Sequence, residues 1–104
     1  MDFFKKSLDI LNELIQTNPY YYIRMTLKGM ILNGLKQFNL AIQALNQACN
    51  LNPISHEAWF HKGEAFFNLK QYEQAKVCYS QAILFNPHLV LYQERQNATL
   101  AFLI

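Results

Sequence analysis

The chain has 104 residues, of which 52% are hydrophobic and 14% aromatic, and its formal net charge is +2. This length and composition allow one domain with a buried core and exclude an intrinsically disordered chain. The absence of any block of like charges argues against nucleic acid or an anionic membrane as a partner, and no apolar run reaches the roughly 18 residues of a membrane span.

The N-terminal stretch, residues 2–16, predicts an amphipathic helix because its apolar side chains recur at helical spacing. The residues on that apolar face are Phe4, Leu8, Leu11, Leu14 and Ile15. Charged residues alternate with them from the start, which argues against a signal peptide. By the same criterion, further helices are expected at 20–33, 38–51, 54–68, 72–85 and 88–103.

An Asn-Pro pair precedes each of three predicted helices. The prolines are Pro19, Pro53 and Pro87, so the pairs recur at an interval of 34 residues. Asn18 is expected to cap the helix that follows it, and Pro19 suits a first helical turn, where a missing N–H costs nothing. Other short motifs recur at the same interval, and a period of this length indicates a repeat architecture.

The second copy of this pattern resembles the tetratricopeptide repeat, through residues Trp59, Gly63, Ala75, Tyr79, Ala82 and Pro87. Lys62 departs from the family, since leucine is usual there. The preceding copy matches the family pattern less well at the Trp and Leu positions, but its other motif residues stand at the same places in the repeat. The resemblance covers essentially the whole chain and implies an all-α fold, a right-handed α-solenoid of antiparallel helix pairs. The single domain would then begin with the second helix of a truncated repeat at 2–17. Two full repeats would follow at 20–53 and 54–87, and a terminal or capping helix at 88–104.

Small residues are expected where the two helices of a pair approach closely. Gly29 and Gly63 lie inside predicted helices, where glycine costs about 1 kcal/mol relative to alanine. That cost is understandable if Gly29 faces Ala41, and Gly63 faces Ala75, in a close contact between helices.

The last predicted helix departs from the repeat. Gln93, Gln96 and Asn97 stand at the places of Trp59, Lys62 and Gly63. A capping helix should present a polar outer face, yet the sequence ends on Leu103 and Ile104. This ending favours a truncated array over a partner that covers the helix.

Candidate catalytic groups are sparse, so no enzyme activity, catalytic residue or cofactor is expected. The serines have no fixed His and Asp partners, and there is no glycine-rich phosphate loop. Glu57, His61 and Glu64 share one helix face and could bind a divalent metal, but an exposed polar strip is the favoured interpretation because no second helix offers a fourth ligand. Cys49 and Cys78 are interpreted as reduced, buried thiols of a cytoplasmic protein.

The resemblance also implies a concave surface that binds a protein or peptide and is lined by the first helix of each pair. Carried over residue by residue, the family's groove positions are Ile23, Thr26, Met30, Asn33 and Gly34, then Glu57, Phe60, Glu64, Phe67 and Asn68, and on the last helix Leu91, Glu94, Ala98 and Ala101. Apolar groups mixed with carboxylates suit a partner with apolar anchors and some basic residues. Phe60 and Phe67 are the preferred anchors, and packing between neighbouring repeats is the alternative for either.

Co-chaperone members of the family clamp the acidic tail of heat-shock chaperones with Lys and Asn residues. Here the corresponding places hold Thr26 and Met30 in one repeat, and Phe60 and Glu64 in the next. Glu64 would repel a terminal carboxylate, which excludes that function. The expected role is therefore an adaptor or scaffold module for another partner. The alternative is a structural component that forms a homo-oligomer through the repeat ends or the apolar terminal helix.

Overall fold

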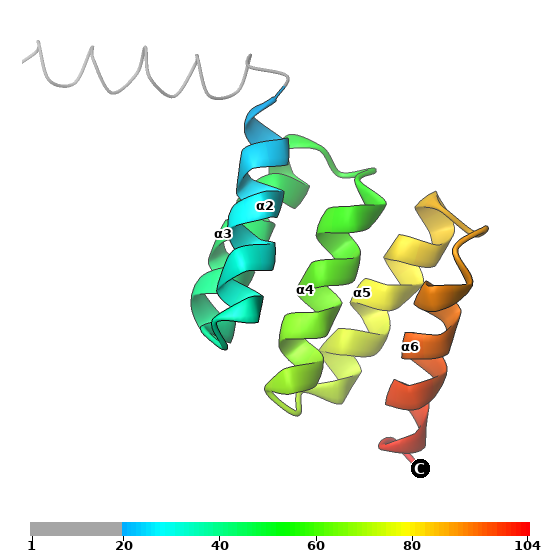
Figure 1. The fold of residues 1–104 in the computed structure, drawn as a ribbon. Coiled ribbons are helices and arrows are strands. Elements are labelled where there is room, and N and C mark those ends of the chain that lie inside the picture. Colours follow the sequence, from blue (N-terminus) through cyan, green and yellow to red (C-terminus); the bar gives the residue numbers. More distant parts are fainter. Residues whose placement is uncertain (1–19) are drawn as a thin grey trace, which may run out of the picture.

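The computed structural model describes residues 20–104, and this part of the chain forms five α-helices without a strand (Figure 1). Their bounds are Tyr21–Gly34 for α2, Phe38–Leu51 for α3, His56–Asn68 for α4, Tyr72–Phe85 for α5 and Val90–Ala101 for α6. The helix expected at 2–16 lies outside the described residues. Between residues 20 and 104, no helix has both the length and the apolar character required to cross a membrane.

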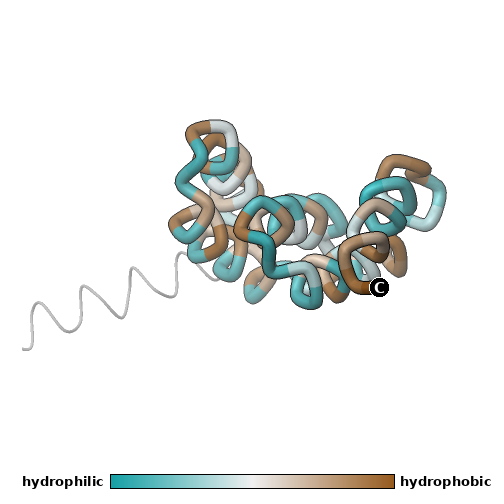
Figure 2. The backbone as a smooth tube through the Cα atoms, turned by 90° about the horizontal axis from the view of Figure 1, so that it is seen from below, coloured by the Kyte–Doolittle hydropathy of each residue, from teal (hydrophilic) through white to brown (hydrophobic). Residues whose placement is uncertain are grey.

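The helices pack in chain order as antiparallel neighbours. α2 packs on α3 and α4 packs on α5, while α3 contacts α4, and α5 contacts α6. Viewed end-on, they follow an arc (Figure 2). α2 also contacts α4 directly, so the first helices of the two pairs lie on the same side of the array. The fold is thus an α-solenoid of helix pairs.

Alanine fills most of the contacts between these helices. The fully buried alanines, each with 0% exposure, are Ala41, Ala48, Ala58, Ala65, Ala75 and Ala82. Two large residues, Leu45 and Tyr79, are also fully buried, one in each pair. Small side chains let the backbones approach, and the two large ones supply much of the apolar area that is removed from water.

The side chain nearest to each glycine is a large one, and not the alanine expected there. A Cβ atom placed on Gly29 would contact the Leu45 side chain, and one on Gly63 would lie 2.8 Å from Cε1 of Tyr79. Each glycine therefore makes room for the one large, fully buried residue on the second helix of its pair.

The two described Asn-Pro pairs, at 52–53 and 86–87, end helices instead of starting them, while the cap expected at Asn18 and Pro19 lies outside the described residues. Asn52 is the C-cap of α3 and Asn86 that of α5, with φ values of −140° and −148°. The following prolines force this extended backbone and stop each helix. As a result α4 and α6 begin two residues later than expected, at His56 and Val90. At its other end, α6 stops at Ala101 instead of residue 103. Ser55 is the N-cap of α4, and its Oγ accepts a hydrogen bond from the backbone N–H of Ala58.

Lysine occupies the left-handed position in the tight turn of each pair. Lys36 and Lys70 both have φ of 62°. In the second turn, the N–H of Lys70 donates to the carbonyl of Phe67 and the N–H of Gln71 to that of Phe66. This hydrogen-bond pattern usually has glycine where the lysine stands.

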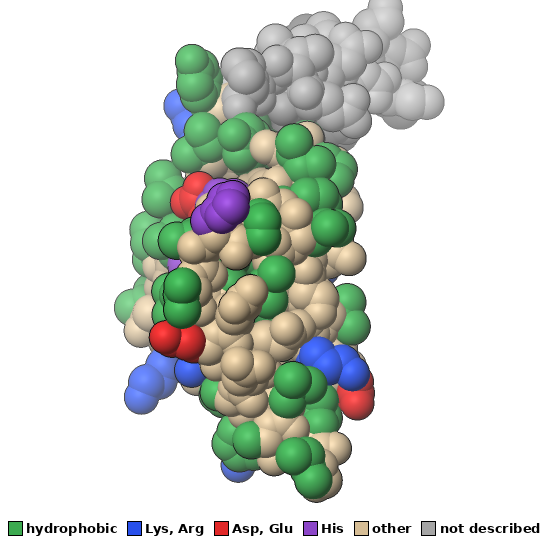
Figure 3. All heavy atoms as spheres, turned by 90° about the vertical axis from the view of Figure 1, so that its right-hand side faces the viewer, with side chains coloured by type: hydrophobic (Ala, Val, Ile, Leu, Met, Phe, Trp, Pro, Cys, Tyr) green, Lys and Arg blue, Asp and Glu red, His purple; other side chains and the backbone are tan. Residues whose placement is uncertain are grey.

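Helix α6 closes one end of the described array. Figure 3 looks onto this end, where uncharged polar groups and backbone occupy much of the middle of the face, between hydrophobic side chains. Gln96 donates to the hydroxyl of Ser80 at 2.6 Å and so ties α6 to α5. Tyr92 stands one repeat after Ala58 and is buried, so a large aromatic replaces the small residue of the preceding repeat.

Candidate functional site

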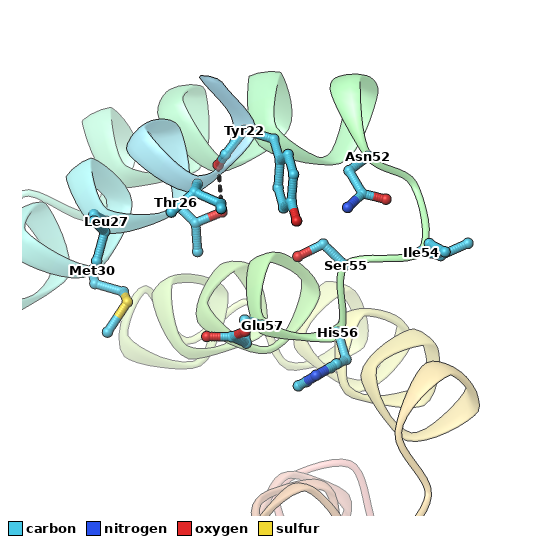
Figure 4. Close-up of a pocket in the computed structure, with 10 residues that line it drawn as sticks. Tyr22, Thr26, Leu27, Met30, Asn52, Ile54, Ser55, His56 and Glu57 are labelled. Carbon is cyan, nitrogen blue, oxygen red and sulfur yellow. Dashed lines mark hydrogen bonds between the residues drawn. The ribbon is translucent and has the colours of Figure 1, made fainter. Parts of the chain in front are cut away.

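A groove of about 330 Å³ lies between α2 and the start of α4 (Figure 4). It is lined by Tyr22, Ile23, Thr26, Leu27, Met30, Asn52, Ile54, Ser55, His56 and Glu57. We call it the α2–α4 groove. Four of the predicted site residues meet there, namely Ile23, Thr26, Met30 and Glu57.

The walls of the α2–α4 groove are mostly apolar and partly exposed. Ile23 and Met30 on α2 are 40% and 38% exposed, and Ile54 in the preceding loop is 67% exposed. Thr26 is buried, and its hydroxyl donates to the carbonyl of Tyr22 at 2.8 Å, so the polar atom is satisfied inside the helix. Tyr22, Thr26 and Met30 point from α2 toward α4 (Figure 4).

Glu57 supplies the charge of this groove. It is exposed, and no Lys or Arg stands among the described residues that line the groove. His56, beside it, is held at 2.6 Å from the hydroxyl of Tyr92 through Nδ1. The groove therefore offers a ligand one carboxylate, beside apolar side chains of α2 and the polar side chains of Asn52, Ser55 and His56.

Phe60 does not line an open groove, so its prediction as an anchor for a ligand conflicts with the structure. It is 8% exposed and stacks on Tyr92 of α6, with the ring centroids 4.6 Å apart. Its ring also lies 5.8 Å from that of Tyr79. Packing between neighbouring helices, the alternative interpretation, describes Phe60.

Glu64 is held inside the array by two partners. Nε of Arg95, on α6, donates to its carboxylate at 2.7 Å, and the hydroxyl of Tyr79 donates to the same oxygen. Burial, together with the hydrogen bond and charge of Glu64, raises the pKa of Tyr79. Burial opposes the charge on Arg95, but the bond to Glu64 outweighs it and raises the pKa of Arg95. This carboxylate is therefore already neutralised by the chain's own arginine.

Phe67 is also covered by the chain itself. The guanidinium of Arg95 lies 4.6 Å from the centre of its ring. Phe102 and Tyr72 both meet its ring edge-on, with centroid distances of 5.7 Å and 5.5 Å. Phe67 therefore has a role in attaching α6 to the last helix pair and is only partly accessible.

The other predicted groove residues are spread along the array. The side-chain nitrogen of Asn33 donates to the carbonyl of His61 at 3.0 Å, which links α2 to α4, while its buried oxygen has no hydrogen-bond partner among the described residues. Asn68 is exposed and donates to the carbonyl of Glu64. Leu91 and Glu94 are exposed on α6.

The carboxylate–histidine face considered for a metal is not assembled as a ligand set. Glu64 is bound to Arg95, and burial lowers the pKa of His61, with Glu64 and Glu57 opposing that shift in part. Within residues 20–104, no group of three His, Cys, Asp or Glu side chains is placed to hold a metal ion. Cys49 and Cys78 are free and buried, and burial raises the pKa of each thiol, that of Cys78 to about 11.

Sequence reasoning missed six of the ten residues that line the α2–α4 groove. Asn52, Ile54 and Ser55 form its end wall from the loop between α3 and α4. The groove positions of the family pattern all lie on the first helices of the repeats, so this pattern could not indicate groove residues in the loops. Tyr22 and Leu27 belong to the apolar periodicity of α2 and could have been included on that ground.

Two models of the tetratricopeptide repeat match the sequence, one over residues 24–55 and the other over residues 56–89. The sequence matches no curated protein at a significant level. Among solved structures, the first TPR domain of human RPAP3 is similar, with a TM-score of 0.79, 23% identity, and coverage of 98% of this chain and 84% of that one.

Two further structures are similar in fold. The first TPR of Spaghetti (RPAP3) bound to the HSP90 peptide SRMEEVD has a TM-score of 0.79 at 23% identity and covers 98% of this chain and 85% of that one. The MamA RS-1 ArsTM double mutant has a TM-score of 0.73 at 19% identity, and the match covers 91% of this chain and 53% of that one. Together with the repeat models, the fold places this chain in the tetratricopeptide repeat family, whose repeats form protein-interaction modules.

Proposed function

We propose that the chain is an adaptor or scaffold module that binds a short segment of a partner protein in the α2–α4 groove. The observation that carries this proposal is the lining itself, in which apolar side chains on α2 and in the loop before α4 lie beside the carboxylate of Glu57, with no Lys or Arg among the described lining residues. A segment that combines aliphatic side chains with a Lys or Arg complements such a surface. Both cysteines are free, which favours a reducing compartment such as the cytoplasm.

The anchoring contacts are assigned to α2 and the loop before α4. Ile23 and Met30 have apolar surface left to bury, and Ile54 extends it at the end of the groove. Asn33, Asn68, Leu91 and Glu94 would be contacted only by a longer segment that continues across α4 toward α6. Phe60 is left out of the proposed binding site because Tyr92 covers it.

An acidic chaperone tail is not the proposed ligand. The peptide SRMEEVD is bound by a structural neighbour, and its carboxylates would meet Glu57 here. Among the described residues, no Lys or Arg lines the α2–α4 groove to offset this repulsion.

The test is a selection of peptides from a phage-displayed random library on the whole chain, followed by binding measurements on the peptides obtained. We expect aliphatic residues next to Lys or Arg, and dissociation constants of about micromolar. Glu57→Lys should weaken binding about tenfold, and Met30→Ala should weaken it as well. Glu73→Lys is the matched control, because Glu73 is an exposed carboxylate on α5 outside the groove. Selected peptides that are acidic, or that ignore Glu57→Lys, would overturn the proposal.

A second candidate function is assembly through the ends of the repeat array. Ile31 and Leu35 at the α2 end are 64% and 61% exposed, and Leu100 and Phe102 at the α6 end are 40% and 58% exposed. Exposed apolar groups of this size often mark interfaces between copies. Sedimentation velocity over a concentration series distinguishes the two functions, because a species that stays monomeric throughout is incompatible with self-assembly.

A further inference from the structure

A second groove lies between α4 and α5, on the other face of α4. It has a volume of about 350 Å³ and is lined by Trp59, Lys62, Phe66, Glu73, Gln74, Val77 and Cys78. We call it the α4–α5 groove. Phe66 follows Glu57 by nine positions, and at about 100° per residue the two side chains leave α4 in opposite directions. The α4–α5 groove and the α2–α4 groove are therefore separate surfaces.

The same feature recurs one repeat earlier. A smaller groove of about 180 Å³ between α2 and α3 is lined by Lys28, Leu32, Leu40, Gln43, Ala44 and Gln47. A shift by one repeat places Lys28 on Lys62, and Leu32 on Phe66. The two grooves thus share a lysine beside apolar side chains, at a position where leucine is usual in this family.

Lys62 brings a cation without an acidic partner to the α4–α5 groove. Its ammonium lies 4.8 Å from the centre of the Trp59 ring, and among residues 20–104 it forms no ion pair. The carboxylate on the opposite rim, Glu73, is paired with Lys76 at 3.2 Å. Of the two opposite charges that line the groove, Glu73 is therefore already paired, and among the described residues Lys62 is the one left to pair with a ligand, beside an apolar floor.

The floor of this groove is fixed before any ligand arrives. The indole N–H of Trp59 donates to the carbonyl of Pro53 at 2.8 Å, which sets the orientation of the ring. Phe66 and Val77 form the remaining apolar wall, and Val77 is 54% exposed. A rigid aromatic surface with adjacent apolar area is typical of sites that bind one bulky side chain.

We propose that the α4–α5 groove is a second docking surface, which binds an acidic segment of a partner protein. A bulky apolar side chain of that segment packs on Trp59, Phe66 and Val77, and an adjacent carboxylate pairs with Lys62. A second carboxylate, one repeat away, pairs with Lys28. Because the charge left to pair with a ligand is that of Glu57 in the α2–α4 groove and that of Lys62 in this one, the two faces select partners of opposite charge.

Trp59 is the single tryptophan of the chain, so its fluorescence reports directly on occupation of this groove. The probe is an amphipathic peptide with Leu and Phe on one face and Glu on the other. Its counterpart has Lys in place of every Glu. Titration of the acidic peptide should change the Trp59 emission to saturation, and the basic peptide should not.

Two variants test the role of the lysine. Lys62→Glu should weaken binding of the acidic peptide about tenfold. Lys62→Leu restores the usual residue of the family, which protects the fold while it removes the charge and fills the groove, and it should abolish the change in emission. Lys70→Glu, in the turn between α4 and α5, is the matched charge reversal outside both grooves and should leave binding unchanged.

Three results would overturn the inference. These are equal binding of the acidic and basic peptides, unchanged binding by Lys62→Leu, and binding of the acidic peptide that is lost in Glu57→Lys or Met30→Ala but not in Lys62→Glu. The last result would place the peptide in the α2–α4 groove. The proposed function can fail independently of this inference. It is tested with basic peptides that bind the α2–α4 groove, whereas this inference is tested with acidic peptides that bind the α4–α5 groove.

Discussion

Replacing Gly63 by alanine is expected to destabilise the fold, although alanine is the better helix former. A Cβ atom at this position would lie 2.8 Å and 2.9 Å from two ring carbons of Tyr79. That ring is fully buried, and its hydroxyl donates to Glu64, so it cannot retreat without losing the bond. Overpacking of a core costs about 1–3 kcal/mol and the helix propensity of alanine returns about 1 kcal/mol. Because the ring cannot move, the overpacking cost lies in the upper part of that range, about 2–3 kcal/mol, and the expected net loss of unfolding free energy is about 1–2 kcal/mol.

Gly34→Ala is the matched control, because nothing lies within 4 Å of a Cβ atom placed there. It should keep the gain in helix propensity and raise the unfolding free energy by up to about 1 kcal/mol. Urea denaturation followed by circular dichroism measures both variants. A Gly63→Ala protein at least as stable as the wild type would refute the close-packing argument. A Gly34→Ala protein with a lower unfolding free energy than the Gly63→Ala protein would refute it as well.

Two further predictions concern the same helix pair. The raised pKa of Tyr79 means that, above its ordinary value of 10.0, the unfolded chain loses this proton first. The unfolding free energy should therefore fall as the pH rises above about 10, by about 1.4 kcal/mol per pH unit for this group, and less steeply in Tyr79→Phe. If the unfolding free energy falls equally steeply with pH in the wild type and in Tyr79→Phe, the loss does not come from the Tyr79 hydroxyl. Lys70→Gly should raise the unfolding free energy by about 0.5–1 kcal/mol, because glycine adopts φ of 62° without strain. An unchanged or lower melting temperature would argue against strain at this turn.

The sequence predicted the two described helix pairs well. The bounds of α3 and α5 coincide with the expected ranges 38–51 and 72–85. Periodic apolar residues and the turn motifs act over a few neighbouring positions, so these helices can be recognised locally. The starts of α4 and α6 were less well predicted, since the same Asn-Pro pair is compatible with the end of one helix or the start of the next.

The candidate site was predicted only in part. Ile23, Met30 and Glu57 come together in the α2–α4 groove because the repeat register places them on one face of their helices. The family register gave the same weight to Phe60 and Glu64, which the structure buries or neutralises. The last helix departs from the repeat pattern, so its effect on these residues could not be inferred from the pattern.

The sequence by itself determined that this chain folds as repeated helical pairs, because periodicity, turn residues and close-approach glycines act within one repeat. Only the tertiary structure decided which side chains of the predicted surface remain accessible. Tyr92 and Arg95 cover Phe60 and Glu64 from α6, and the Arg95–Glu64 contact spans 31 positions of sequence. Contacts over such separations depend on how neighbouring helices stack, which no local pattern in the sequence records.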